Sequence, residues 1–532
     1  MTDDQLIPDE VALPEGEVAL EKVSVEPHFL TELIIGFVAP TGVGFDAVSD
    51  QLVEQLLHVG YRTEKIRVSD YLRKMSGKSD EELTAYDDRI RILQDAGDQL
   101  RRDHGPDALA VVAIAEIRRR RLAYWREHGE SRGEDDPVPA TAYLVWSFKH
   151  PREVERLHRT YLSRFFLISA FSPRSKREEN LAVAIAKSRN DRGREPQYRS
   201  RAIDTIDRDE WEALNDDGPV GRRDQSDDYG QDVREAYPLA DYFMDARTEP
   251  QILASTNRVV QLLFGHPFVT PTRDEYGMYI AHAAMLRSSE MGRQVGASIA
   301  TASGEIIATG TNDVPAPLGG HYWSGDPCDA REFKLGYDTN DAFKRQLAEQ
   351  IVGRLFTKKL IHGDLKERQD AVLDLLNGTR LHDVIEYTRA LHGEMSALMD
   401  AARRGVSVAN ATMFVTTFPC HLCTRLIIAA GISRLVYLYP YPKSLALQLY
   451  SDAISTDVAT SDRVLFQGFL GVAPAKYSAV FTATRRKDES GTAVKWQPRL
   501  SGPRLPDVEQ DVVDYVLHEQ LVVHEATWLD MH

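Results

Sequence analysis

Short apolar runs alternate with stretches of helical periodicity along the first half of the chain. The runs are short enough for buried strands and lie at 33–38, 61–68, 141–148, 164–169 and 240–244. A helix is predicted over about 47–57, and further helical patterns separate the other runs. Strands that alternate with helices predict an α/β fold with a doubly wound parallel sheet.

The pattern changes after about residue 271, where a second set of elements begins. It predicts helices at 275–291 and 443–451, strands at 294–300, 305–310, 413–416 and 434–439, and a strand and helix mixture over 507–522. An irregular loop rich in Gly and Pro spans 312–327. A largely helical, charged insertion is expected at about 338–388, before the next motif.

Three segments therefore describe the organisation that we expect. Residues 1–28 are acidic, contain Pro and lack a sustained period, so they predict a flexible N-terminal segment. Residues 29–268 form the first domain, with a charged insertion at about 188–237 that we expect to be mobile in part. Residues 269–532 form the second domain, and the chain shows no internal repeats.

Composition narrows the class of protein. The 532 residues are 42% hydrophobic, which is enough for more than one core, and no run approaches the roughly 18 apolar residues of a membrane helix. The acidic N-terminus lacks a signal-peptide pattern, so a soluble cytoplasmic protein without a membrane partner is expected. The net charge of −17 argues against a general electrostatic grip on DNA or RNA.

Three cysteines exclude a disulfide framework, and two of them lie in one motif. Cys420 and Cys423 stand in Pro-Cys-His-Leu-Cys, and His392 stands in His-Gly-Glu. A C-x-x-C brings two thiolates onto one turn, where they bind a tetrahedral ion and leave a position for water. Both motifs open helical patterns, so two helix starts would converge on one Zn²⁺. Cys328 is left over, and we expect it to be a buried free thiol.

Glu394 distinguishes a catalytic site from a structural one. A lone C-x-x-C in an intracellular protein is more often a structural zinc knuckle or a redox pair. A structural site has no use for a neighbouring carboxylate, whereas H-x-E followed by P-C-x-x-C is the signature of zinc deaminases. In that chemistry Glu394 is the catalytic residue that moves protons between water and substrate. The pattern therefore favours hydrolytic deamination.

A second candidate site lies where the first strand runs into a Gly-rich turn and a helix, the layout of a phosphate-binding loop. The candidate nucleotide contacts there are Gly36, Thr41, Gly42, Val43 and Gly44. The loop departs from the Walker pattern, with Ala39 for the first glycine, Phe45 for the lysine and Asp46 for the Ser/Thr. Without that lysine, phosphoryl transfer loses its main charge stabiliser, so a degenerate kinase-like domain is favoured over an active kinase.

The second domain resembles the deoxycytidylate deaminase branch of the cytidine-deaminase fold, an α/β/α arrangement. The resemblance rests on Gln294-Val295-Gly296-Ala297, Thr309-Gly310-Thr311-Asn312, His392-Gly393-Glu394 and Pro419-Cys420-His421-Leu422-Cys423, with Gly393 in place of the usual Ala. Residues 147–155 are weakly similar to a stretch of P-loop nucleotide kinases. With that kinase-like domain in front, the chain resembles bacterial phage-defence dCTP/dCMP deaminases.

The resemblance implies hydrolysis of a cyclic amidine C–N bond, converting dCTP or dCMP to the deoxyuridine nucleotide and depleting dCTP during phage infection. It also implies a hexamer built from dimers, control by dTTP or dCTP, and an inhibitory partner such as a small RNA.

The resemblance also assigns substrate-binding candidates. Asn312 matches the position that hydrogen-bonds the sugar, and a buried Asn that holds its loop is the alternative. Arg287, Ser288 and Arg293 are candidates for phosphate contacts, and Tyr441 is a candidate for a contact near the base.

Two other functions remain open. A nucleic-acid-editing cytidine or adenosine deaminase shares the zinc signature, but it needs a basic, aromatic-lined channel. A nucleotide-sensing protein would instead use its zinc structurally and release no ammonia.

Overall fold

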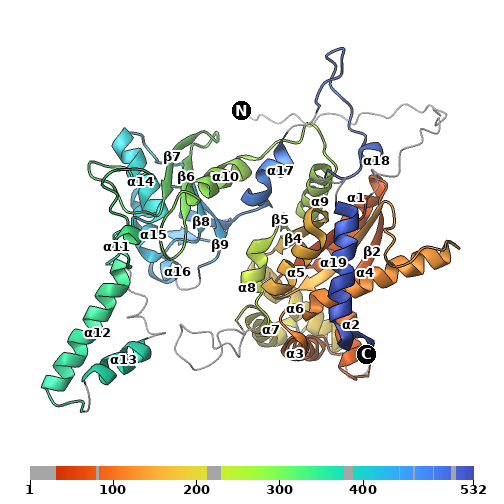
Figure 1. The fold of residues 1–532 in the computed structure, drawn as a ribbon, viewed down its shortest axis with the longest axis horizontal. Coiled ribbons are helices and arrows are strands. Elements are labelled where there is room, and N and C mark those ends of the chain that lie inside the picture. Colours follow the sequence, from red (N-terminus) through yellow and green to blue (C-terminus); the bar gives the residue numbers. More distant parts are fainter. Residues whose placement is uncertain are drawn as a thin grey trace.

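The computed structural model describes residues 31–79, 83–211, 229–362, 365–376, 387–441, 444–458, 460, 462–482, 485–504 and 511–531. Two six-stranded sheets organise these residues, and Figure 1 shows the first sheet on the right and the second on the left. The predicted flexible segment at 1–28 lies outside the described residues. Among the described helices, none is long and apolar enough to cross a membrane.

The first sheet consists mainly of parallel strands. Its strands are β1 (Leu33–Val38), β2 (Arg62–Arg67), β3 (Thr141–Phe148), β4 (Phe165–Phe171), β5 (Tyr242–Asp245) and β12 (Gly471–Val472). They run in the order β12-β5-β4-β1-β3-β2, and β12 alone is antiparallel to its neighbour in this order. All five apolar runs of the first half therefore become strands.

Helices cover both faces of this sheet, as the doubly wound prediction requires. One face of β1 packs on α1 (Phe45–His58) and α9 (Glu249–Leu263), and the other packs on α4 (Ala108–Glu127) and α5 (Pro151–Tyr161). Every residue of β1 is buried, because a strand covered on both sides has no solvent-facing positions.

The second sheet mixes parallel and antiparallel pairs. Its strands are β6 (Gly296–Ala300), β7 (Ile306–Thr311), β8 (Thr412–Thr417), β9 (Arg434–Tyr439), β10 (Ile454–Ser455) and β11 (Val464–Gly468). The order is β10-β11-β9-β8-β6-β7, and β6 is antiparallel to both of its neighbours. Helices α14 (Gly393–Arg404) and α15 (His421–Ala429) pack on one face, and α10 (Arg273–Met285) packs on the other. This is a mixed α/β domain of three layers.

Helix α10 is shorter than predicted: it ends at Met285 and not at residue 291. Ser288 Oγ donates to the carbonyl oxygen of Asn312 at 2.6 Å, and Ser289 Oγ donates to the Asp313 carboxylate. These polar side chains bond to the loop after β7, so the chain leaves the helix at that point.

Two other predicted elements differ in the structure. Within the described part of the predicted helix at 443–451 only α16 (Ala446–Leu449) is helical, and the described part of the predicted mixture at 507–522 belongs to one helix, α19 (Asp511–Glu525). The charged insertion contains α7 (Arg199–Trp211) and α8 (Val233–Ala236), and its residues 212–228 lie outside the described part. The described part of the insertion before His392 is largely helical as predicted, with α12 (Thr339–Thr357) and α13 (Leu365–Leu376).

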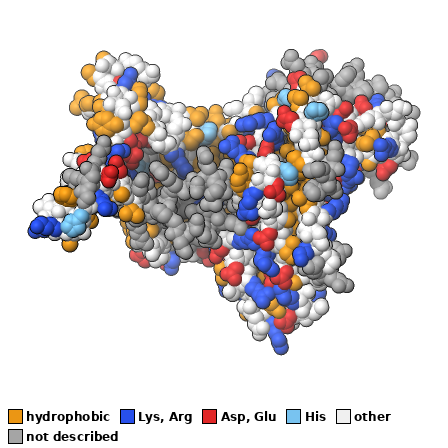
Figure 2. Space-filling view, turned by 60° about the horizontal axis from the view of Figure 1, so that its bottom comes forward, with side chains coloured by type: hydrophobic (Ala, Val, Ile, Leu, Met, Phe, Trp, Pro, Cys, Tyr) orange, Lys and Arg blue, Asp and Glu red, His pale blue; other side chains and the backbone are white. Residues whose placement is uncertain are grey.

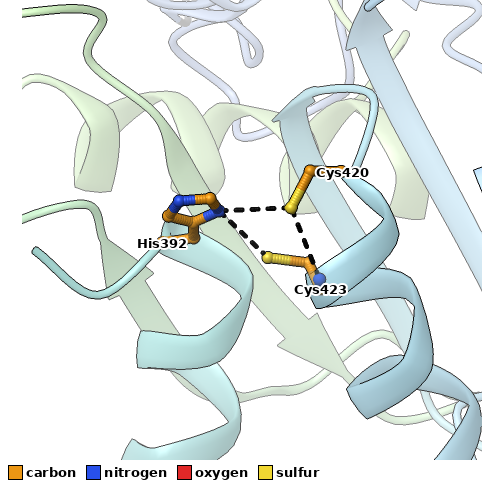
Figure 3. A group of neighbouring side chains, drawn as sticks. All are labelled: His392, Cys420 and Cys423. Atoms are coloured by element: carbon orange, nitrogen blue, oxygen red, sulfur yellow. Dashed lines mark hydrogen bonds between the residues drawn. The ribbon is translucent and has the colours of Figure 1, made fainter. Parts of the chain in front are cut away.

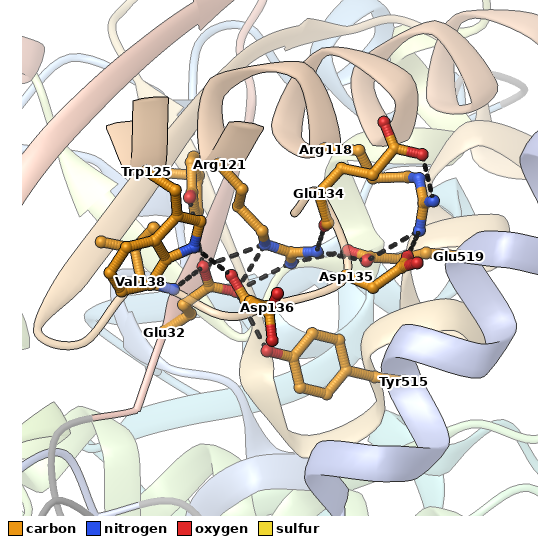
Figure 4. A network of polar contacts seen from close by, with 11 residues as sticks. Glu32, Arg118, Arg121, Trp125, Glu134, Asp135, Asp136, Val138, Tyr515 and Glu519 are labelled. Atoms are coloured by element: carbon orange, nitrogen blue, oxygen red, sulfur yellow. Dashed lines mark hydrogen bonds and ion pairs between the residues drawn. The ribbon is translucent and has the colours of Figure 1, made fainter. Parts of the chain in front are cut away.

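The C-terminal part of the chain returns to the first sheet. Strand β12 pairs with β5, and α19, drawn in blue in Figure 1, packs on α4 and α5. Figure 4 shows the buried contacts that hold it, where Arg121 lies between two carboxylates. Its guanidinium lies 2.7 Å from Glu32 and 2.8 Å from Glu519, and all three side chains are inaccessible to solvent. These contacts show that residues 471–472 and 511–525 pack with the elements of the first sheet. The domain boundary at residue 268 stays a prediction.

Candidate functional site

Two helix starts bring the proposed metal ligands together. His392 is the N-cap of α14, and Cys420 is the N-cap of α15. Helix α14 lies directly on β7, where a Cβ on Gly310 would come within 2.1 Å of the Gly393 carbonyl oxygen. The glycine is needed because any side chain there would push α14, and His392 with it, away from the sheet.

The donor atoms of His392, Cys420 and Cys423 point toward one another, as Figure 3 shows. The Nδ1 atom of His392 lies 3.4 Å from Sγ of Cys420 and 3.3 Å from Sγ of Cys423. A tetrahedral zinc ion with ordinary bond lengths would hold nitrogen and sulfur about 3.5 Å apart. The geometry therefore fits one ion held by these three side chains.

Electrostatics of the cluster also favour a cation. The hydrogen bond with Cys423 lowers the pKa of the Cys420 thiol to about 4, and His392 adds to the effect against burial. Burial, followed by the bond to Cys420, raises the pKa of Cys423 well above its ordinary value. The pKa values of the two adjacent buried thiols are therefore shifted in opposite directions, and a divalent cation would allow both to be thiolates.

Opposing effects act on the pKa of the His392 imidazole. Burial lowers its pKa, but the hydrogen bond with Cys420 and the charge of Glu394 outweigh burial and raise it to about 9. The imidazole is therefore held in a strongly negative surrounding, which is the environment that a bound cation would neutralise.

Glu394 lies beside this cluster in the first turn of α14 and is 3% exposed. Burial raises the pKa of its carboxyl to about 7, and the charge of Cys420 adds to the rise. Glu394 is absent from the group of ligand atoms that converge, although it lines the same pocket. A carboxyl group with that pKa is able both to accept and to donate a proton near neutral pH.

An open pocket of about 460 Å³ leads to the cluster. Its lining includes His392, Glu394 and Cys420 together with the predicted substrate-binding residues Arg293, Asn312 and Tyr441. Arg287 and Ser288 are absent from this lining. The structure thus brings three of the five substrate candidates to the pocket.

Asn312 also makes the contacts of its alternative role. Its Oδ1 accepts a hydrogen bond from the Val295 N–H, and its Nδ2 donates to the carbonyl oxygen of Arg293, both at 2.6 Å. The side chain therefore joins the segment before β6 to the end of β7. A sugar contact by Asn312 stays a prediction.

Arg287 and Ser288 contact other parts of the loops. Arg287 stacks on Trp323, with its guanidinium carbon 3.8 Å from the ring centre, and donates to the Tyr322 carbonyl oxygen. Ser288 is buried and bonds to the Asn312 carbonyl oxygen. Both side chains shape the loops behind the pocket, and their phosphate contacts stay predictions.

Sequence reasoning missed one wall of the pocket, formed by Glu290, Asp338 and Asn340. Carboxylate oxygens of Glu290, Asp338 and the adjacent Glu332 lie within 4.8 Å of one another. These residues come from separate loops and a helix start, so no local spacing marks them in the sequence. The expectation for the third cysteine was wrong, because Cys328 is exposed.

The Gly-rich turn after β1 borders a second pocket, of about 240 Å³, which Thr41, Gly42 and Val43 line. Gly44 is the N-cap of α1, and Gly36 lies inside β1. A Cβ on Gly36 would come within 2.6 Å of the Phe165 ring, so this glycine serves sheet packing. Three of the five predicted loop residues therefore reach the pocket.

Comparisons with known proteins agree with the zinc centre. Residues 271–439 match the family model of the cytidine and deoxycytidylate deaminase zinc-binding region, which identifies Zn²⁺ as the cofactor of this part. The deoxycytidylate deaminase of Enterobacteria phage T2 is 44% identical over 54 residues, covering 10% of this chain and 29% of that protein. The chain thus spans less than a third of that relative's length.

Two other proteins are similar to a longer part of this chain. The deoxycytidylate deaminase of Homo sapiens is 26% identical over 192 residues, 36% of this chain and 72% of the human protein. The crystal structure of dCMP deaminase from the cyanophage S-TIM5 in complex with dCMP and dUMP has a TM-score of 0.22 and 16% identity. That match covers 38% of this chain and 98% of the other.

Proposed function

We propose that this chain is a zinc-dependent hydrolytic deaminase that converts deoxycytidine nucleotides to deoxyuridine nucleotides. One observation carries the proposal. The buried Glu394 shares an open pocket with His392 and Cys420 and is not one of the three side chains whose ligand atoms converge. The relatives named deoxycytidylate deaminase support the choice of substrate.

His392, Cys420 and Cys423 would hold the ion. When bound, Zn²⁺ supplies a Lewis acid that lets water lose a proton near neutral pH. Glu394 accepts that proton and donates it to the ring nitrogen beside the carbon that water attacks. It then assists the amino group to leave as ammonia, so water and a cytosine ring give a uracil ring and ammonia.

The remaining pocket walls would position the nucleotide. Arg293 is a cation at the mouth and would contact a phosphate, since a guanidinium forms strong hydrogen bonds with phosphate oxygens. Tyr441 lies in the same lining and would contact the base, and Asn312 would reach the sugar while it holds its loop.

The wider biological role rests on the resemblance of the paired domains. On that ground the substrates include dCTP as well as dCMP, and deamination depletes dCTP in cytoplasmic defence against phage. The kinase-like first domain, a hexamer of dimers, an allosteric dTTP or dCTP and an inhibitory small RNA belong to the same proposal.

Electrostatics argue against the nucleic-acid-editing alternative. The chain carries a net charge of −17, and basic and acidic side chains lie intermixed on the face shown in Figure 2. A channel for single-stranded nucleic acid instead follows the backbone with a positive groove.

A substrate panel tests the proposal directly. Purified, zinc-loaded protein is incubated with dCMP, dCTP, CTP and a cytosine-containing oligonucleotide, with and without dTTP, and ammonia release is measured. We expect product from dCMP or dCTP and a response to dTTP. Product from the oligonucleotide alone would establish an editing enzyme, and ammonia from none of the four would favour a structural zinc.

A further inference from the structure

The turn after β1 already binds an anion of the protein's own. The Thr41 N–H donates a hydrogen bond of 2.7 Å to the Asp209 carboxylate, 168 residues further along the chain. Asp209 lies in the last turn of α7, and its side chain is inaccessible to solvent. A buried carboxylate is costly unless its charge is compensated, so Asp209 needs a positively charged partner in addition to this N–H.

Lys149, which follows β3, supplies the positive charge. Its Nζ lies 2.8 Å from a carboxylate oxygen of Asp209 and 2.9 Å from the Ala39 carbonyl oxygen. The loop has Phe45 where a lysine is usual, and Lys149, which follows the neighbouring strand β3, contacts the turn instead. An ammonium group and a backbone N–H therefore converge on one anion position.

Contacts on the other side hold the turn in place without Asp209. Arg177 donates to the Thr41 carbonyl oxygen at 3.3 Å, and Asn180 donates to that of Gly42 at 3.0 Å. Gly42 has a φ of +92°, and a Cβ there would come within 2.7 Å of the Arg177 carbonyl oxygen. The direction of the Thr41 N–H is therefore set by the scaffold, as in a preformed anion site.

The adjoining pocket offers room for the rest of a ligand. Besides the turn, its lining includes aromatic rings and side-chain amides, namely Tyr86, Gln94, Trp146 and Gln231. Flat rings and amide groups are the side chains that pack against a nucleobase and hydrogen-bond to its edge.

We propose that the turn 39–44 and Lys149 form a binding site for the phosphate group of a nucleotide, and that Asp209 occupies it when the nucleotide is absent. Carboxylate and phosphate oxygens accept the same two donors, so they compete for one position. Binding therefore displaces Asp209, and the end of α7 moves with it. This site is separate from the zinc centre, and its test does not depend on deaminase activity.

Titration calorimetry of the full chain tests this competition, with ATP and inorganic phosphate as probes. Asp209→Asn removes the competing charge and should tighten ATP binding by about tenfold. In the wild type, the molecules in which Asp209 fills the phosphate position cannot bind ATP, and this lowers the apparent affinity. Adding Lys149→Met should abolish the gain. Asp50→Asn is the matched control, since Asp50 is an exposed acid on α1 that pairs with Lys65.

Inorganic phosphate should bind more weakly and show the same dependence on Asp209 and Lys149. Equal affinity of Asp209→Asn and wild type for both probes would overturn the proposal, as would tight binding that survives Lys149→Met. A gain for phosphate without a gain for ATP would overturn the nucleotide assignment.

Wild-type protein provides a second measurement in case Asp209→Asn does not fold. Carbodiimide modification of each carboxylate is followed by mass spectrometry with and without ATP. ATP should raise the modification of Asp209, which is inaccessible to solvent without nucleotide, and leave the exposed Asp50 unchanged. Unchanged modification of Asp209 at saturating ATP would contradict its displacement.

Discussion

The half of the molecule built on the first sheet and the half built on the second sheet differ in how their main buried polar clusters are completed. In the first half, Arg121 lies between Glu32 and Glu519, and Lys149 pairs with Asp209. Each of these charges is neutralised by another residue of the chain. In the second half, the donor atoms of His392, Cys420 and Cys423 instead face one another (Figure 3).

This difference distinguishes buried ion pairs that stabilise the fold from a cluster of side chains that is suited to hold a metal ion. Internal ion pairs with good geometry need nothing further, so they hold elements such as α19 in place. A cluster of donors without a cation of its own is complete only with an ion from outside. The second half should therefore depend on its metal in a way that the first does not.

The largest effect should come from removing a zinc ligand, because the second half is expected to depend on its metal. Cys423→Ser should reduce the zinc content from one ion per chain to near zero, lower the melting temperature and abolish ammonia release, because one of the three zinc ligands is lost. Metal analysis by mass spectrometry checks the outcome. Cys328→Ser is the matched control, since that thiol is exposed. Full zinc occupancy in Cys423→Ser would contradict the ligand assignment.

Replacing the carboxylate separates metal binding from chemistry. Glu394→Gln should keep zinc and the fold but reduce turnover by about a thousandfold, the range of general acid and base catalysis. Steady-state kinetics and zinc content are measured on the same sample. Glu349→Gln, on the exposed side of α12, should behave as wild type. Near-normal turnover of Glu394→Gln would refute the proposed role.

An ion pair of the first half should matter for stability alone. Glu519→Gln leaves Arg121 with a single buried carboxylate partner and should lower the free energy of unfolding by about 3 kcal/mol. Urea denaturation measures the change. The control Glu525→Gln lies exposed on the same helix and should change it by less than about 0.5 kcal/mol. Equal effects would mean that the buried pair does not hold α19.

The smallest effect should come from packing behind the zinc centre. Gly310→Ala places a methyl group against α14 and should cost about 2 kcal/mol, with faster loss of zinc to a chelator. Gly353→Ala, where a Cβ meets no neighbouring atom, should be neutral or stabilising by up to about 1 kcal/mol. Unchanged zinc loss in Gly310→Ala would show that α14 tolerates displacement.

Local patterns allowed much of the fold to be predicted. The boundaries of β3 and β9 match the predicted ranges, because burial on a sheet imposes an apolar run of definite length. The predicted zinc ligands lie together because a C-x-x-C and a His at helix starts need only short-range geometry. The early end of α10 was not predictable, since it depends on bonds from Ser288 and Ser289 to a loop more than twenty residues away.

By itself, then, the sequence determined the strands β1 to β9, part of the helices that cover them and the donor set for one metal ion, since these follow from spacing along the chain. Only the tertiary structure decided that β12 and α19 return to the first sheet, that Glu290 and Asp338 line the reactive pocket, and that Asp209 meets the turn after β1. Those contacts join residues far apart in sequence. They are selected by the packing of whole elements and by the need to neutralise buried charge, which no local pattern encodes.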